Sequence, residues 1–176
     1  MKYYTLILLL IGCGQEPLDL RNYLQSEALE GKKLLYSCRT TKHYTDTIQH
    51  SGNCIIIHRR YPKLKLADEG GTKTITVPAS SMTYEMCLQS NVLYGSEGED
   101  QDKHIILSNS DWELDGVDCK IIKRSKMTIQ KLNYRTLLAA CSNGSYAIHA
   151  EGLGIVESGY GYPNKIIETK LIKIEP

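Results

Sequence analysis

The sequence predicts an all-β protein with a single domain, built as an antiparallel meander that forms a curved sheet or a partly open barrel. From Lys32 onward, short runs rich in Ile, Leu, Val, Tyr and Thr alternate with turn residues, at a spacing typical of all-β domains. Several runs are joined by dipeptides that favour tight hairpins, which implies antiparallel neighbours. The length of 176 residues suits one domain with its own core.

The first residues have the features of a secretory signal. Lys2 supplies a positive charge, an apolar run continues to Ile11, and the chain becomes polar at residues 15–16. The run is far shorter than the ~20 residues that a helix needs to cross a bilayer. We therefore expect residues 1–12 to be a signal peptide that is removed.

The remaining chain divides into a short tether and the β domain. Residues 13–31 contain Leu and Ala at loose helical spacing, and Gly31 is a helix stop signal. This segment is predicted to be a helical or extended tether. Residues 32–176 are predicted to form the antiparallel β domain.

Local alternation identifies individual strands. In residues 82–89, Met, Tyr, Met and Leu alternate with polar side chains, which predicts a strand with one buried face. Residues 74–77 alternate in the same way, and Pro78 ends that run. Gly52–Asn53 precedes a further apolar run at residues 54–57.

Two dipeptides predict hairpin turns. Asn143–Gly144 and Asp115–Gly116 can take positive φ at both residues and so close two-residue hairpins. The flanking runs are residues 137–141 and 146–148 for the first turn, and residues 112–114 and 117–119 for the second.

Two longer breaks complete the pattern. Residues 95–102 are acidic and contain glycine, so we expect an exposed loop there. Residues 159–164 form another break, and the last strand is predicted at residues 165–174.

Charge and motifs exclude several functions. The formal net charge is +1, and removal of Lys2 brings it to about zero, which disfavours nucleic-acid binding. The chain has no Gly-x-Ser-x-Gly, no His-Glu-x-x-His and no Gly-rich phosphate loop. No enzymatic activity and no cofactor are predicted.

The end of the apolar run carries a more specific motif. Leu10-Ile11-Gly12-Cys13 resembles the lipobox of bacterial lipoproteins. The resemblance implies a diacylglyceryl group on the Cys13 sulfur, cleavage before Cys13, and a membrane partner reached through this anchor. By analogy with the lipoprotein sorting rule, Gly14 in place of Asp favours the outer membrane of a bacterial cell envelope. The alternative is an ordinary signal peptide and a secreted soluble protein.

Two further stretches resemble uncharacterised β-rich lipoproteins of Bacteroidetes-like bacteria. These stretches are Val77-Pro78-Ala79 and the glycine-containing residues 152–158, followed by the predicted last strand. The chain departs from the commoner pattern in having Ser80 where glycine is frequent and no aromatic side chain at Met82. The resemblance implies a curved or partly closed antiparallel sheet, and it brings no known chemistry.

The cysteines predict one disulfide. If Cys13 is lipidated, five cysteines remain in an oxidising compartment, and none of them forms a Cys-x-x-Cys motif. The best candidate pair is Cys38 with Cys54, because both lie on predicted neighbouring strands. Buried thiols are the alternative.

A cluster of potential metal ligands lies in the same region. The candidates are His50, Cys54 and His58, with His43 nearby. Their spacing matches no usual zinc pattern, although Cys54 and His58 would share one face of a strand. The alternative is a polar region with solvated histidines.

The predicted function is non-catalytic binding or interaction in the cell envelope. A concave sheet face offers a site for a hydrophobic ligand, and a free sheet edge offers a site for an envelope protein. Candidate lining residues are Tyr84, Met86, Tyr146 and Ile148, which are otherwise core residues. The alternatives are a structural or assembly subunit that docks another envelope protein, and a metal-dependent enzyme.

Overall fold

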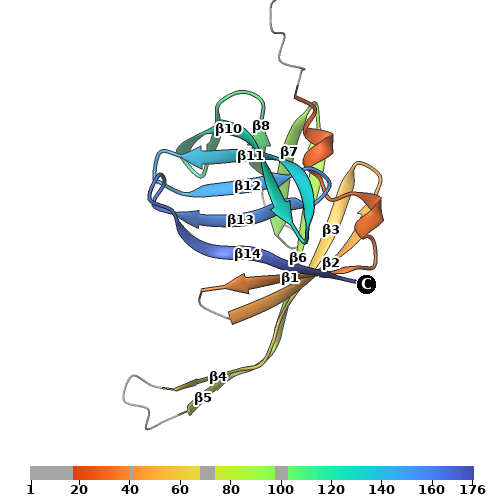
Figure 1. Cartoon of the computed structure of the whole chain (residues 1–176), viewed down its shortest axis with the longest axis vertical. Coiled ribbons are helices and arrows are strands. Elements are labelled where there is room, and N and C mark those ends of the chain that lie inside the picture. Colours follow the sequence, from red (N-terminus) through yellow and green to blue (C-terminus); the bar gives the residue numbers. More distant parts are fainter. Residues whose placement is uncertain (1–17, 40–41, 68–73, 98–102) are drawn as a thin grey trace, which may run out of the picture.

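The structure is a computed structural model that describes residues 18–39, 42–67, 74–97 and 103–176. A 12-stranded antiparallel sheet curls into a nearly closed barrel, and a separate two-stranded sheet projects from it (Figure 1). This confirms the predicted all-β class and the partly open barrel. The predicted signal peptide and Cys13 lie outside the described residues. Among the helices that are described, none is long and apolar enough to cross a membrane.

The barrel consists of two six-stranded halves. The first half contains β1 (Lys33–Cys38), β2 (Lys42–Ser51), β3 (Cys54–Tyr61), β6 (Ser80–Gln89), β7 (Val92–Glu97) and β8 (His104–Ser108). The second half contains β9 (Trp112–Leu114), β10 (Val117–Ile129), β11 (Leu132–Cys141), β12 (Tyr146–Ala150), β13 (Gly154–Tyr160) and β14 (Ile166–Glu175).

The strand order is that of a meander that returns to its start. The order is β8-β7-β6-β3-β2-β1-β14-β13-β12-β11-β10-β9. Strands β1 and β14 pair antiparallel and join the two halves, with Tyr36 opposite Leu171. The ends of the sheet are β8 and β9, which follow each other in the chain. The barrel is therefore interrupted only between these two strands, within the described residues.

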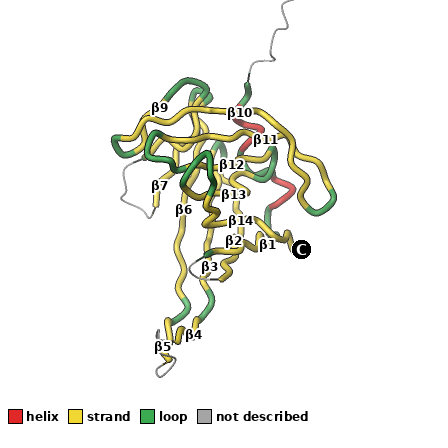
Figure 2. Tube along the Cα trace, turned by 60° about the vertical axis from the view of Figure 1, so that its left-hand side comes forward, coloured by secondary structure: helices red, strands yellow, loops and turns green. Residues whose placement is uncertain are grey.

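A hairpin extends the β3–β6 pair away from the barrel. It consists of β4 (Leu64–Ala67) and β5 (Thr74–Val77), which pair antiparallel. Figures 1 and 2 show it as an arm outside the barrel. Pro62 and Pro78 stand where the arm begins and ends, and proline cannot donate to a strand ladder. The predicted strand at residues 74–77, ended by Pro78, is confirmed.

Two short 3₁₀ helices precede β1 and lie beside the barrel (Figure 1). They are η1 (Leu20–Tyr23) and η2 (Glu27–Leu29). Leu20 is fully buried and Leu29 nearly so. From Leu18 onward, the segment predicted as a tether is therefore packed against the β domain.

The two predicted hairpin turns have different outcomes. At Asp115–Gly116 both residues have positive φ, 51° and 78°, so the two-residue turn is confirmed. At Asn143–Gly144 the prediction is wrong in detail, because only Gly144 has positive φ, 85°. The Oδ1 atom of Asn143 instead accepts hydrogen bonds from the backbone N and the Oγ of Ser145, at 2.9 and 2.7 Å. These bonds stabilise a longer loop, in which Cys141 and Ser145 form the closing pair.

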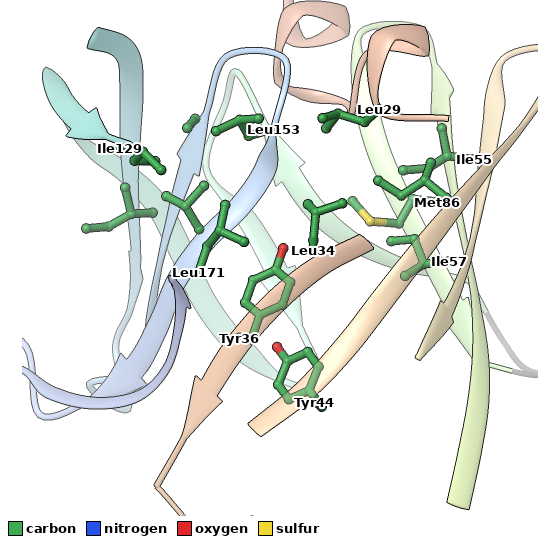
Figure 3. Packing of buried hydrophobic residues seen from close by; sticks show 14 of the residues in the cluster. Leu29, Leu34, Tyr36, Tyr44, Ile55, Ile57, Met86, Ile129, Leu153 and Leu171 are labelled. Carbon is green, nitrogen blue, oxygen red and sulfur yellow. The ribbon is translucent and has the colours of Figure 1, made fainter. Parts of the chain in front are cut away.

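Two clusters of apolar side chains fill the protein. The larger one contains residues from both halves of the barrel and from η2, and Figure 3 shows Leu29, Leu34, Met86 and Leu171 among them. The smaller cluster includes Leu107 of β8 and Trp112 of β9. Apolar packing therefore links β8 and β9, which no strand ladder joins.

Two disulfides cross neighbouring strands. Cys54 of β3 is bonded to Cys87 of β6, and Cys119 of β10 to Cys141 of β11. In each pair the two cysteines lie directly opposite each other in the register.

The predicted Cys38–Cys54 disulfide is wrong. Cys38 lies opposite Lys42, at the first residue of β2, whereas Cys54 lies opposite Ser51, at the last residue of β2. The two cysteines are therefore separated by the length of that strand. Cys38 takes part in neither disulfide.

Candidate ligand-binding cavity

A cavity of about 350 Å³ lies within the barrel, against the first half of the sheet. A dry engineered cavity of about 150 Å³ holds a benzene molecule, so this cavity has room for a larger apolar molecule. Its apolar and aromatic lining consists of Tyr36, Tyr44, Ile57, Tyr84, Met86, Ile106 and Ile155. Its polar lining consists of Gln25, Asp46, Arg59, Glu85, Ser96 and His104, with Gly95 among them.

The strand register explains how these residues meet. Ile57 lies opposite Tyr84, and Met86 lies opposite Gly95, so β3, β6 and β7 present them on one face. Gly95 has no side chain, and Ile106 of β8 occupies the space that a Cβ atom would take. At β7 the absence of a side chain on Gly95 therefore lets Ile106 pack against the strand and form part of the cavity wall.

One ion pair lies in this wall. The Nε and Nη2 atoms of Arg59 donate to the Oδ1 and Oδ2 atoms of Asp46, each at 2.9 Å. The Asp46 side chain is 2% exposed and that of Arg59 is 23% exposed. Burial raises the pKa of Asp46, while its hydrogen bonds and charge interaction with Arg59 oppose the rise.

Aromatic rings hold the guanidinium group in place. The Arg59 Cζ atom lies 4.0 Å from the ring centroid of Tyr44 and 4.9 Å from that of Tyr84. Tyr36 stacks on Tyr44 with the centroids 4.8 Å apart, and the two rings are seen together in Figure 3. Burial raises the pKa of Tyr44, so its hydroxyl stays protonated at neutral pH. These contacts fix the position of the Arg59 side chain in the cavity wall.

Two of the four predicted ligand-binding residues line the cavity. They are Tyr84 and Met86, on β6. The hydroxyl of Tyr84 donates to the Met82 sulfur at 3.3 Å.

The other two, Tyr146 and Ile148, do not line it. Ile148 lies opposite Glu157, whereas the next residue, His149, lies opposite the cavity residue Ile155. The register shifts between Ile148 and His149, and Tyr146 and Ile148 belong to the same buried apolar cluster as the cavity residues Ile57 and Met86 without lining the cavity themselves. Tyr146 is buried there and donates to Glu157 Oε1 at 3.3 Å, and burial together with Glu157 raises its pKa to about 12.

The structure does not bring the predicted metal ligands together. The Cys54 sulfur is bonded to Cys87 and offers no thiolate. His50 lies opposite Ile55, so it faces the other side of the sheet from Cys54 and His58. In the part of the chain that the structure describes, the atoms with metal-like spacing belong to Cys54, Glu85 and Cys87, whose sulfurs form the disulfide.

The sequence pattern missed Gln25, Asp46 and Arg59. Tyr44, Asp46 and Ile48 alternate along β2, and this alternation is the signal for the buried face. The pairing of Asp46 with Arg59 depends on the β2–β3 register, which the local pattern does not give.

The fold and the site thus define a small antiparallel β-barrel with a mostly apolar cavity. Comparison of the chain with protein-family models, with curated proteins and with solved structures found no match. The resemblance to β-rich lipoproteins stays a prediction.

Proposed function

We propose that this protein is a non-catalytic binding protein that holds a small, mostly apolar molecule in the barrel cavity. The observation that supports this function is the cavity of about 350 Å³ with its aromatic and aliphatic lining. Ligand sites are typically concave and apolar, with a few placed polar groups. The Arg59–Asp46 pair and Gln25 supply such groups.

Calorimetric titration with 1-octanol tests this proposal. We expect one molecule to bind per chain and Ile57→Phe to weaken binding at least tenfold, because the larger ring enters the cavity from β3. Ile56→Phe is the matched control, since Ile56 is the next residue on β3 and does not line the cavity. Absence of binding to the native protein, or equal weakening by both variants, would contradict the proposal.

We further propose that the protein works at the cell envelope, anchored through lipid on Cys13. The support is the sequence Leu10-Ile11-Gly12-Cys13 behind a short apolar run. Two or more acyl chains give stable membrane anchoring. The intact mass of the protein from the membrane fraction tests this. A chain that starts at Cys13 and carries added lipid supports the anchor, and an unlipidated soluble product supports the secreted alternative.

The projecting β4–β5 hairpin favours a second candidate function, which is docking of another envelope protein. A two-stranded arm has two edges that can accept a partner strand. Replacement of residues 64–77 by a tight turn separates the two functions. Loss of a stoichiometric partner with unchanged octanol affinity supports docking, whereas unchanged association with that partner argues against it.

A further inference from the structure

A basic groove lies beside η1, where the described chain begins. The groove has a volume of about 370 Å³ and is lined by Leu18 and by three exposed basic side chains, those of Arg124, Lys126 and Arg135. Lys126 of β10 lies directly opposite Arg135 of β11, and Arg124 precedes Lys126 by two residues on the same strand. Because side chains two apart on a strand, and those paired across strands, share a face, the register brings the three charges together.

The acidic side chains of the groove do not cancel this charge. Asp19 and Glu151 line the groove as well. The Asp19 carboxylate caps η1 by accepting a hydrogen bond from Arg21 N at 3.0 Å, and Glu151 lies 4.0 Å from the Nε atom of Arg135. With the exposed Arg21 of η1, four basic residues stand against two acidic ones among the described residues of this surface. The surface therefore attracts anions.

The proposed lipid anchor brings a membrane close to this groove. Cys13 precedes Leu18 by five residues, and a chain of this length spans at most about 18 Å when fully extended. Leu18 itself lines the groove. A barrel held by lipid on Cys13 therefore keeps the groove near the lipid headgroups.

The β4–β5 arm lies at the other end of the molecule. Figure 1 shows η1 near one end of the long axis and the arm at the opposite end, and Figure 2 shows the same arrangement from another side. With the basic groove against the membrane, the arm points away from it. This orientation leaves the arm accessible to a partner protein.

We infer that the basic groove docks the barrel on a membrane surface that carries anionic phospholipid. Lysine and arginine side chains are attracted to such a surface, and a basic patch adds to the attachment that acyl chains provide. This inference rests on the proposed lipid anchor, and it adds the class of lipid and the orientation of the barrel.

Acetylation of individual lysines in the lipidated protein tests the inference. The protein from the membrane fraction is reconstituted into vesicles of phosphatidylcholine alone or of an equal mixture with phosphatidylglycerol. It is then treated with acetic anhydride, and peptide mass spectrometry gives the rate at each lysine. We expect Lys126 to react about threefold more slowly in the mixed vesicles, because an anionic surface covers nearby amines and keeps them protonated. The exposed Lys63, where the arm begins, is the internal control and should react equally in both.

A pair of matched variants assigns the effect to the groove. Arg124→Gln combined with Arg135→Gln removes two charges and keeps Lys126 as the reporter, so we expect the difference between the vesicles to disappear. Lys33→Gln combined with Arg60→Gln removes two charges from exposed positions on β1 and β3 and should preserve the difference.

The outcomes separate the inference from the anchor on which it rests. If Lys126 reacts at the same rate in both kinds of vesicle, the inference is wrong and the anchor stands. If the purified chain carries no lipid and does not sediment with vesicles, the anchor fails and the inference fails with it. If both variants lose the difference, or neither does, the groove is not the docking surface. The comparison in the native protein decides the first two cases even if a variant does not fold.

Discussion

Asp46 and Arg59 lie directly opposite each other on β2 and β3, and both carboxylate oxygens of Asp46 accept hydrogen bonds from the guanidinium group at 2.9 Å. Asp46 is almost fully buried, so its charge depends on Arg59 for compensation. The pair also holds the guanidinium group between the rings of Tyr44 and Tyr84. It therefore determines the shape of one wall of the cavity.

Loss of Arg59 alone should be more harmful than loss of the pair. We expect Arg59→Met to lower the free energy of unfolding by about 3 kcal/mol at pH 7, because it leaves a buried carboxylate without a partner. The double variant with Asp46→Leu should be more stable than Arg59→Met alone, since it removes the stranded charge. Urea denaturation measures both values. The single variant Asp46→Leu is measured as well. If the double variant loses as much unfolding free energy as Arg59→Met and Asp46→Leu lose together, the two residues are not coupled.

The two disulfides should be identifiable by peptide mapping without reduction. We expect linked peptides that join Cys54 with Cys87 and Cys119 with Cys141. A linked peptide containing Cys38 and Cys54 would contradict the strand register.

Each disulfide should also stabilise the fold. The bonded residues are 33 and 22 positions apart in sequence, and closure of loops of these lengths gives about 3 kcal/mol each in the chain-entropy account. Paired Cys→Ser variants, Cys54 with Cys87 or Cys119 with Cys141, should lower the free energy of unfolding by this amount. A change below 1 kcal/mol for both pairs would contradict the expectation.

His149 should make the fold sensitive to acid. It is fully buried, neither ring nitrogen has a hydrogen-bond partner among the described residues, and burial lowers its pKa from 6.5 to about 4. Between these two values the unfolded chain binds a proton that the folded protein does not. Stability is therefore lost as the pH falls from 6.5 towards 4, by about 3 kcal/mol over the whole interval.

His149→Leu tests this sensitivity. Urea denaturation at pH 7 and at pH 4.5 gives the acid-induced loss of stability for each protein. We expect this loss to be about 2 kcal/mol smaller in His149→Leu than in the native protein. His58→Leu, at an exposed position on β3, is the control for replacement of a histidine by leucine. Equal losses in the native protein and in His149→Leu would contradict the assignment.

The local sequence pattern predicted where strands and turns lie better than it predicted which strand ends lie side by side. The alternation in residues 82–89 corresponds to β6, and Asp115–Gly116 forms the expected two-residue turn. Both features depend on residues adjacent in sequence. The Cys38–Cys54 pairing failed because it required knowledge of which ends of β1 and β3 lie together.

The cavity lining was predicted only in part, because a local sequence pattern gives the face of one strand but not the contacts between distant segments. Tyr84 and Met86 lie on one face of β6 by simple alternation, and both line the cavity. Gln25 comes from the segment before β1, and Arg59 depends on a partner 13 residues away. Their roles follow from tertiary contacts that no short pattern contains.

Methionine methyl resonances provide the most direct test of the central claim, that the cavity is the ligand site. The protein labelled with ¹³C at its methionine methyl groups is titrated with 1-octanol and followed by NMR. The account predicts a saturable shift of the Met86 resonance, because Met86 lines the cavity, and no comparable shift of Met127, which lies on β10 and does not. A shift of Met127 without one of Met86, or no shift of either resonance, would contradict it.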